Sequence, residues 1–435
     1  MCSTNFKLLF ILLLQGATSV LPAQETHSLS VDDLFRLGEA NSLRLKATHV
    51  QQLMAEEREK TARTARLPEM TVGLTGGYIG GVTLFKQGLT EATHPDTPDW
   101  SQNYNVQLIQ PIYSGGRIEN NLRQASLQKQ LAALNLITDK ADLKLFLLRQ
   151  YLNLIGYYKQ QEVFARNIEE SEVRLKDIRR MRKEGVVTRN DEIRSELQLT
   201  NDRLNEQEAK NSIIIASQQL TVVLGLDESQ IIRPDTAVLF TASSLLSYDE
   251  YVAEAYTHYP ELQIAQYHKE LAQKGVELMK AELLPSLSLR AGNILARPYT
   301  SANDVFANTW NVSLNVSYPL SSLYRNRHQM REARQNVFLY QTREEQARQE
   351  LRIRVNGALI RHREAVNRVA ALALSVRQAE ENYRMVRNRY LNQLSILTDL
   401  LDASNVRLQA ELQLTAARTE TIYTYYELQR SCGHL

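Results

Sequence analysis

The sequence predicts a mixed α and β fold in which two copies of one structural unit follow each other along the chain. Glycine and proline are scarce, with 17 and 10 among 435 residues, so long uninterrupted elements are expected. Similar segments recur at a constant spacing, which indicates an internal repeat. Four short runs alternate between apolar and polar residues, the period of a β-strand. Long helices and four strands, shared between two internal structural repeats, are therefore the expected content of the chain.

Composition excludes several classes of function. The 51 Lys and Arg nearly balance the 49 Asp and Glu, so the chain lacks the strongly basic character of most nucleic-acid-binding proteins. Two Cys and eight scattered His form neither a disulfide framework nor a Cys-rich metal site. The H-E-x-x-H, P-loop and G-x-S-x-G strings do not occur. We expect no enzyme, no metal or other cofactor, and no nucleic-acid partner.

The N-terminus has the features of an export signal. Lys7 precedes the apolar run Leu8–Leu14, and Leu21-Pro22-Ala23 resembles a cleavage site. We predict a signal peptide at 1–23, with a buried N-terminal helix as the alternative. Cleavage would leave Cys432 as the only thiol, and no later run reaches the ~18 apolar residues of a membrane helix.

The internal repeat is defined by three pairs of segments. Leu67-Pro68 recurs as Leu284-Pro285 at an offset of 217, whereas the strand ending Gln110-Pro111 recurs as Tyr318-Pro319 at 208. The segment 187–191 recurs as 395–399, again at 208. The first repeat, 24–230, is predicted to hold a helix at 31–67, strands at 70–80 and 103–113, a long helix at 117–184 and a helix at 192–224. The second, 248–423, is predicted to hold a helix at 248–284, strands at 286–292 and 310–318, a long helix at 325–392 and a helix at 396–423. An inter-repeat belt segment at 231–247 and a C-terminal tail at 424–435 complete the chain.

The long helices have the pattern of a coiled coil. From Leu127 to Ile155, positions spaced alternately by four and three residues are apolar at eight of nine places. The long helix predicted at 117–184 would be about 100 Å long. The shorter helices 31–67 and 192–224, stacked end to end, would match that length. We therefore expect an extended helical shaft.

The strands have the pattern of membrane strands. Residues 310–318 alternate apolar side chains with Asn and Ser, without charge. Such polarity suits the lumen of a transmembrane barrel, although a half-buried sheet on a soluble core is the alternative. Four strands cannot close a barrel, and unpaired edges are not tolerated in lipid, so three copies with twelve strands are expected. Aromatic residues beside these strands are predicted to lie at the membrane interfaces: Trp100, Tyr104, Trp310 and Tyr318.

Several motifs together resemble the outer-membrane efflux protein family, the TolC-like channels. They are the two Leu-Pro strand entries, Gln110-Pro111-Ile112-Tyr113-Ser114-Gly115-Gly116-Arg117, the segment Gly185-Val186-Val187-Thr188-Arg189-Asn190-Asp191, and Tyr390 followed by Thr398-Asp399-Leu400-Leu401-Asp402-Ala403. The resemblance covers essentially the whole predicted mature chain.

The resemblance implies a homotrimer with a twelve-stranded transmembrane β-barrel, four strands per chain, continuous with a long α-helical coiled-coil barrel. It implies a location in the outer membrane, in contact with lipid, with the helical part in the periplasm. Such proteins are passive exit ducts of tripartite efflux pumps or type I secretion systems. An inner-membrane transporter of the RND, ABC or MFS type supplies the energy, and a periplasmic adaptor (membrane fusion protein) connects the two.

The same resemblance implies roles for residues near the two helix breaks. Asp399 and Asp402, which share a helix face, would form the pore constriction, whereas the alternative is that they are ordinary acids near a helix N-terminus. Asp191 and Tyr390 would belong to the gating network, although Asp191 equally fits a capping box and Tyr390 equally fits interhelix packing. Ser395 stands where the family has the Arg of that network.

The predicted adaptor-docking residues lie at the two helix breaks. They are Gly185 and Val186 at the first break, and Gln393 and Leu394 at the second. Gln393 stands in place of the family's glycine, which would favour the turn.

Two further hypotheses remain open. The chain could be an exported soluble coiled-coil scaffold or adaptor, which carbonate or salt would extract from membranes. A hydrolase within the helical belt is the third hypothesis, for which the sequence contains no nucleophile–base constellation.

Overall fold

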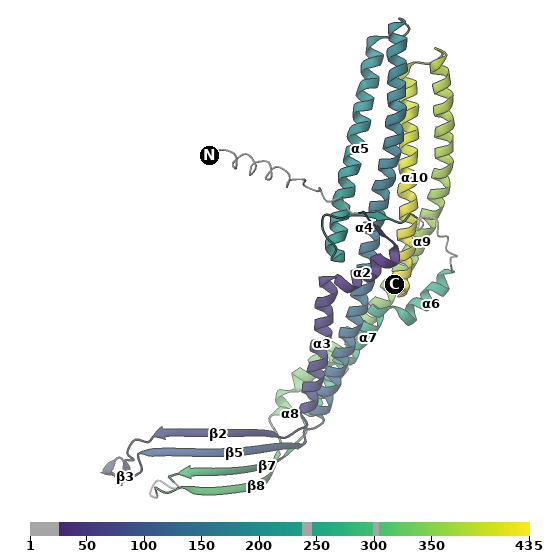
Figure 1. Cartoon of the computed structure of the whole chain (residues 1–435). Helices are drawn as coiled ribbons and strands as arrows, with labels where there is room; N and C mark the ends of the chain where they lie inside the picture. Colours follow the sequence, from purple (N-terminus) through teal and green to yellow (C-terminus); the bar gives the residue numbers. More distant parts are fainter. Residues whose placement is uncertain (1–25, 237–245, 299–303) are drawn as a thin grey trace, which may run out of the picture. The chain divides into compact units, whose positions relative to one another are not determined.

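The computed structural model describes residues 26–236, 246–298 and 304–435 (Figure 1). The predicted signal peptide at 1–23, and residues 237–245 of the predicted belt segment, lie outside the described residues. The elements before the chain midpoint are β1 (Thr26–Leu29), α2 (Val31–Asn41), α3 (Leu43–Thr64), β2 (Glu69–Tyr78), β3 (Leu84–Gln87), β4 (Thr90–Thr93), β5 (Trp100–Tyr113), α4 (Arg117–Lys183), α5 (Arg189–Leu224) and β6 (Ile231–Pro234). Those that follow are α6 (Tyr248–His258), α7 (Pro260–Ala281), β7 (Ser286–Arg297), β8 (Ala307–Ser317), α8 (Ser322–Arg325), α9 (Arg327–Leu391) and α10 (Leu397–Cys432). The fold is mixed, and helix predominates.

The chain forms two compact units. Among the described residues, the first unit contains the chain up to Ala47, then Thr138–Tyr259 and Leu351–Leu435. The second unit contains Thr48–Ile137 and Pro260–Glu350. Both units combine segments from the two halves of the sequence.

The first unit is built around long helices. Its parts of α4, α5, α9 and α10 run side by side (Figure 1), and Leu147, Leu148 and Leu154 of α4 are fully buried. Next to them, β1 and β6 form a parallel pair. The buried hydroxyl of Tyr151 ties this pair to α4, since it donates to the carbonyl of Leu29 at 2.7 Å and accepts from the amide of Asp235 at 2.8 Å. Among the helices of the described ranges, none has both the length and the apolar character of a membrane span.

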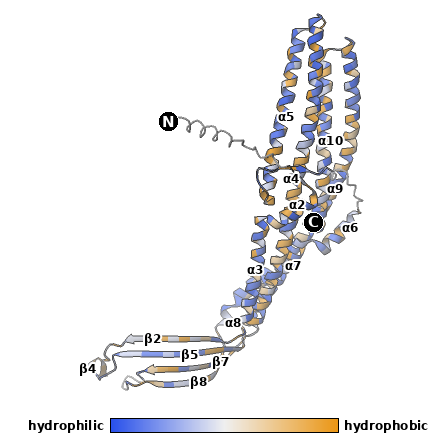
Figure 2. Ribbon diagram, viewed as in Figure 1, coloured by the Kyte–Doolittle hydropathy of each residue, from blue (hydrophilic) through white to orange (hydrophobic). Residues whose placement is uncertain are grey.

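The second unit contains a four-stranded antiparallel sheet in the order β2-β5-β7-β8. Because directly opposed residues in an antiparallel pair lie on one face, the register assigns every position to a face. One row joins Val72, Val106, Asn293 and Trp310, and the next row on the other face joins Thr71, Gln107, Gly292 and Asn311. One face of the sheet is therefore mainly apolar and the other mainly polar, and the alternation is visible along the strands in Figure 2.

Two predicted single helices are each broken in the structure. The helix predicted at 31–67 is α2 followed by α3, because Ser42 ends α2 and its hydroxyl accepts from the amide of Leu45 in the first turn of α3. The helix predicted at 248–284 is α6 followed by α7, because Pro260 keeps Tyr259 extended (ψ 113°) and then begins α7. The two breaks lie 217 residues apart, the offset already seen between the Leu-Pro segments.

The strand boundaries also differ from the prediction. β2 ends at Tyr78 rather than 80, and β5 begins at Trp100 rather than 103. β7 continues to Arg297 and β8 begins at Ala307. Pairing with a neighbouring strand extends β5, β7 and β8 beyond the residues that alternate regularly, and regular alternation is the signal that sequence reasoning uses. β2 is instead two residues shorter at its end. A short hairpin, β3–β4, lies between β2 and β5 and was not predicted; strands of four residues are too short for a periodic pattern.

The ends of the helices in the second half differ as well. The long helix predicted at 325–392 begins at Arg327, after the single turn of α8, and Asn326 between them donates to the carboxylate of Glu282 at 2.7 Å. The predicted tail 424–435 is mostly helical, because α10 continues to Cys432 with Leu428 and Cys432 fully buried. Gly433, at φ 82°, ends α10 in the left-handed conformation that glycine adopts without a steric cost.

Candidate functional site at the two helix turns

The first unit contains two helix-to-helix turns, 184–188 between α4 and α5 and 392–396 between α9 and α10. We call them the tip turns. Gly185, at φ 76°, ends α4: its amide donates to Arg182, and the amide of Val186 donates to the carbonyl of Met181 at 2.9 Å. This pair of bonds is a Schellman motif.

The second tip turn has the same backbone bonds. The amide of Gln393 donates to the carbonyl of Tyr390 and the amide of Leu394 to that of Arg389, both at 2.9 Å. Gln393 adopts φ 61°, a left-handed conformation that costs a non-glycine residue about 1 kcal/mol or more. The replacement of glycine by Gln393 therefore leaves the turn geometry intact at an energetic cost.

The helices that follow the two turns are capped differently. Thr188 caps α5 in a complete capping box: its hydroxyl accepts from the amide of Asp191 at 3.2 Å, and the Asp191 carboxylate accepts from the amide of Thr188 at 2.9 Å. At α10 the cap residue is Ile396, which makes no side-chain cap, and Ser395 donates to the carboxylate of Asp399 at 2.7 Å. The carboxylate of Asp191 thus has a structural role at the start of α5.

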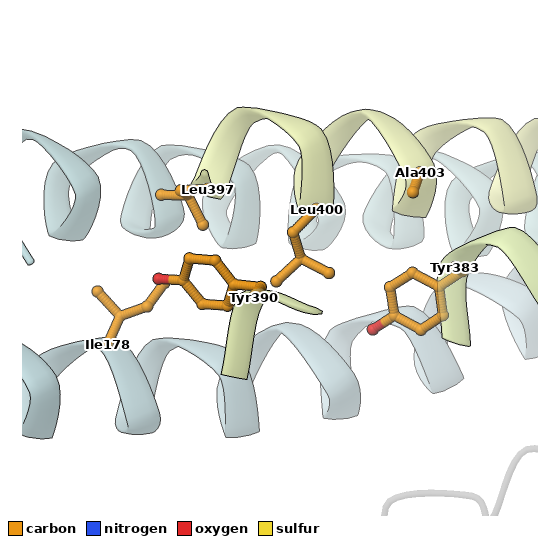
Figure 3. Close-up of a cluster of buried hydrophobic side chains, with 6 residues drawn as sticks. All are labelled: Ile178, Tyr383, Tyr390, Leu397, Leu400 and Ala403. Atoms are coloured by element: carbon orange, nitrogen blue, oxygen red, sulfur yellow. The ribbon is translucent and has the colours of Figure 1, made fainter. Parts of the chain in front are cut away.

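Below the tip turns, a buried cluster joins α4, α9 and α10 (Figure 3). Tyr390 lies at its centre, with the ring of Tyr390 between Ile178 and Leu400 in Figure 3. The cluster consists of Ile178, Tyr383, Tyr390, Leu397, Leu400 and Ala403. Because these side chains come from both halves of the sequence, they fix the α9–α10 pair against α4 near the turns.

The predicted gating pair, Asp191 and Tyr390, is not joined by a hydrogen bond. The Tyr390 hydroxyl is buried and has no partner in the described part of the chain. Burial, and to a lesser degree the charge of Asp191, raises the pKa of Tyr390. Tyr390 is therefore neutral and packs as a core residue, and the charge of Asp191 affects it only through its pKa.

A cavity of about 260 Å³ adjoins the cluster. Tyr383, Tyr390 and Leu400 line it together with Arg174 and Asp177. Arg174 is 7% exposed and donates to the hydroxyl of Ser171 at 2.6 Å, while two of its guanidinium nitrogens have no partner among the residues described. Burial lowers the pKa of this arginine. A buried guanidinium with unmet donors is costly, so Arg174 destabilises this region of the fold.

Asp399 and Asp402 are exposed and lie one turn apart on α10. They face away from Leu400 and Ala403, which are buried in the cluster. Asp399 accepts the hydrogen bond from Ser395. The structure thus places both carboxylates on one solvent-facing side of the second tip turn, as the sequence spacing predicted, and their role at a pore constriction stays a prediction.

The polar contacts between the first helix pair (α4 and α5) and the second (α9 and α10) were not predicted from the sequence. Arg407 of α10 forms a two-point ion pair with Glu170 of α4, and its guanidinium lies 4.1 Å from the ring centre of Tyr383. Nearer the turns, Arg194 of α5 donates to the hydroxyl of Thr398 on α10 at 2.7 Å. These partners are 204 to 237 residues apart in sequence, and only an alignment of the two repeats against each other could have suggested them.

The aromatic residues predicted for the membrane interfaces lie at different positions along the strands of the sheet. Trp100 begins β5 opposite Tyr78, with the two rings in edge-to-face contact at 6.2 Å. Trp310 is the fourth residue of β8 and lies on the apolar face with Tyr104, whereas Tyr318 directly follows β8. All four predicted residues are exposed, with Trp310 at 76%. Their membrane depth stays a prediction.

The described residues contain no group of three or more His, Cys, Asp or Glu side chains that could hold a metal ion. The carboxylates of Asp399 and Asp402 lie on α10 close to the second tip turn and are exposed.

Comparison with known proteins identifies related chains. The family model described as outer membrane efflux protein matches residues 35–226 and 252–434. No curated protein sequence matches the chain.

Solved structures of outer-membrane channels have a similar fold. The outer membrane protein VceC of Vibrio cholerae is 15% identical with a TM-score of 0.79, over 93% of this chain and 96% of that chain. The outer-membrane channel OprN is 18% identical with a TM-score of 0.78, over 93% and 90%. The open state of the MtrE outer membrane channel of Neisseria gonorrhoeae is 17% identical with a TM-score of 0.74, over 93% and 88%.

Proposed function

The chain belongs to the outer membrane efflux protein family, and on this premise we propose that three copies of it form the exit duct of a tripartite efflux or type I secretion system. The family is one of outer-membrane efflux channels rather than enzymes, and its location is the outer membrane. In the proposed assembly, an inner-membrane transporter supplies the energy and a periplasmic adaptor links it to the duct. The duct itself conducts its substrates passively.

The four-stranded sheet carries the proposal. Its strands have 10 to 14 residues, enough to span the hydrocarbon core when tilted. Its apolar face suits lipid and its polar face, which includes Asn105, Gln107 and Asn311, suits a water-filled lumen. Within the described residues β2 and β8 each have only one neighbouring strand, and lipid does not tolerate such open edges. Pairing β8 of one copy with β2 of the next would close a barrel of twelve strands.

The helices of the first unit would then form the periplasmic part of the duct, as a trimeric coiled-coil barrel built from the two structural repeats. The tip turns would be its periplasmic end. We assign adaptor docking to Gly185, Val186, Gln393 and Leu394 there, since these residues lie in two turns of equal backbone geometry. Three copies of Asp399 and Asp402 would place six carboxylates around the opening and favour cations.

Ion conduction tests this function. The purified protein, inserted into planar bilayers, is expected to form channels that prefer cations. The double variant Asp399→Asn/Asp402→Asn is expected to lose most of that preference, because it removes charge without changing size.

A matched control is Asp249→Asn, which removes an exposed first-turn carboxylate from α6. This control should leave the selectivity unchanged. Unchanged selectivity in the double variant would remove the pore role of both carboxylates. Absence of any channel, together with extraction of the protein by carbonate, would favour the soluble scaffold instead.

A further inference from the structure

A basic groove lies on the first helix pair, between α4 and α5, below the turn at Gly185. Its volume is about 460 Å³, and its apolar floor includes Leu175 and Leu199, which are 6% and 7% exposed. Five of its lining residues are basic and one, Glu172, is acidic. The basic residues are Lys176, Arg179, Arg180, Lys183 and Arg203.

Two of these cations are available for a partner. Lys176 and Lys183 are exposed, and neither has a carboxylate oxygen within ion-pair distance in the parts of the chain that the structure describes. They are seven residues apart on α4, which places both side chains on one face with their Cα atoms about 10 Å apart. Arg203 pairs with Glu172 at 2.7 Å, but both side chains are about half exposed, and such surface pairs contribute little.

The helix dipole explains only part of this charge. Lys183 lies in the last turn of α4, where the free carbonyl groups favour a cation. Lys176 lies two turns earlier, and Arg203 lies in the middle of α5, beyond the reach of that effect. Arg179 and Arg180 pair with carboxylates of the chain itself, as Arg203 does. Lys176 is therefore the basic residue that neither the helix dipole nor an ion pair explains.

The second helix pair has fewer of these basic residues, although Arg179 corresponds to Arg387. At the offset of 208 that relates Gly185 to Gln393, Arg180 corresponds to Asn388, Lys183 to Leu391 and Arg203 to Glu411. Lys176 corresponds to Arg384, which forms an ion pair with Glu381 at 2.6 Å. The two helix pairs thus share their turn geometry but differ in charge.

We propose that the basic groove is a docking surface for a protein partner that presents a carboxylate-bearing helical segment. This inference rests on the proposed function and adds to it the chemistry of the partner and the choice of the first helix pair over the second. A helix with Asp or Glu seven residues apart would match the spacing of Lys176 and Lys183, and apolar side chains between them would contact Leu175 and Leu199. The apolar floor favours such a segment over a lipid headgroup, which would need only the charge.

The test uses the full-length protein in detergent and a labelled helical peptide with Glu at positions i and i+7 and Leu between them. Fluorescence anisotropy is expected to show binding that weakens by about tenfold or more between about 0.05 M and 0.5 M salt, since the Debye length falls from roughly 14 Å to roughly 4 Å. The variant Lys176→Glu/Lys183→Glu is expected to bind at least about tenfold more weakly, because like charges would face each other. The control Arg384→Glu changes the corresponding site on the second helix pair and should bind as the unchanged protein does.

A charge-swapped peptide, with Lys in place of Glu at positions i and i+7, controls for misfolding of the variant. It is expected to bind Lys176→Glu/Lys183→Glu better than the unchanged protein. Equal affinity of the Glu peptide for both proteins would overturn the proposal, as would an equal loss in Arg384→Glu. Stronger binding to phosphatidylglycerol vesicles than to the peptide, removed by the same two substitutions, would assign the groove to a lipid surface instead. Channel conductance, measured separately, should be unchanged in the double variant, so a failure of the duct function is distinguishable from a failure of the groove.

Discussion

The substitution Tyr390→Phe tests whether the Tyr390 hydroxyl belongs to the predicted gating network or whether Tyr390 only packs in the buried cluster. The hydroxyl is buried without a partner in the described structure, and the ring lies within the cluster of Ile178 and Leu400. A buried polar group without a hydrogen bond costs about 1–3 kcal/mol. Its removal keeps the ring contacts, so the variant should be as stable as the unchanged protein or up to about 1 kcal/mol more stable. A hydroxyl bonded to Asp191 would instead make the variant about 1 kcal/mol less stable.

Hydrogen exchange of the amides of residues 389–394 measures this difference locally. Exchange in Tyr390→Phe should be unchanged or up to about fivefold slower, which corresponds to about 1 kcal/mol in opening free energy. Tyr383→Phe is the matched control, because the Tyr383 hydroxyl interacts with the carboxylate of Glu170 and its loss should speed exchange by a similar factor. Exchange at least fivefold faster in Tyr390→Phe would refute the packing account and restore the hydroxyl to the gating network.

Three further outcomes are expected. Thr188→Ala should cost about 1 kcal/mol at the start of α5, since it removes one half of the capping box with Asp191; faster amide exchange limited to that turn would report it, and an unchanged rate would contradict the cap. Cys432 should resist maleimide at pH 7–8 in the folded protein, because its side chain is fully buried and burial raises its pKa to about 12. Rapid labelling without denaturant would show that the end of α10 is not packed against the rest of the protein. Burial lowers the pKa of His362, which contacts the hydroxyl of Thr424 at 3.0 Å, so the unfolded state binds more protons and stability should fall as pH drops below about 6.5; His362→Asn should flatten the pH dependence of the melting temperature in this range, and an unaltered slope would exclude His362 as its source.

The elements that sequence reasoning located best are those with a long or regular pattern. Long uninterrupted helices follow from the scarcity of glycine and proline, and α4 ends within one residue of the predicted position because Gly185 terminates it. The strand around Trp310 was recognised by its alternation. The breaks at Ser42 and Tyr259 were missed, since a single serine or an X-Pro step inside an amphipathic pattern is a weak local signal.

The candidate site was predicted in part. The positions of Asp399 and Asp402 on one face of α10 follow from helical spacing alone, and the capping role of Asp191 follows from Thr188 three residues earlier. The buried Arg174 and the ion pair between Arg407 and Glu170 could not be predicted, because they depend on which faces of distant helices meet. Local patterns specify a helix, whereas its partners depend on tertiary packing.

The mass of the purified protein in detergent tests whether three copies of the chain form the proposed duct. Within the described residues, each chain has a sheet with one apolar face and two open edges, which other copies of the chain would close in lipid. We expect a particle of three chains that is resistant to SDS without boiling and separates into single chains on heating. A single chain that stays in solution without detergent would contradict the duct and every role assigned to its tip.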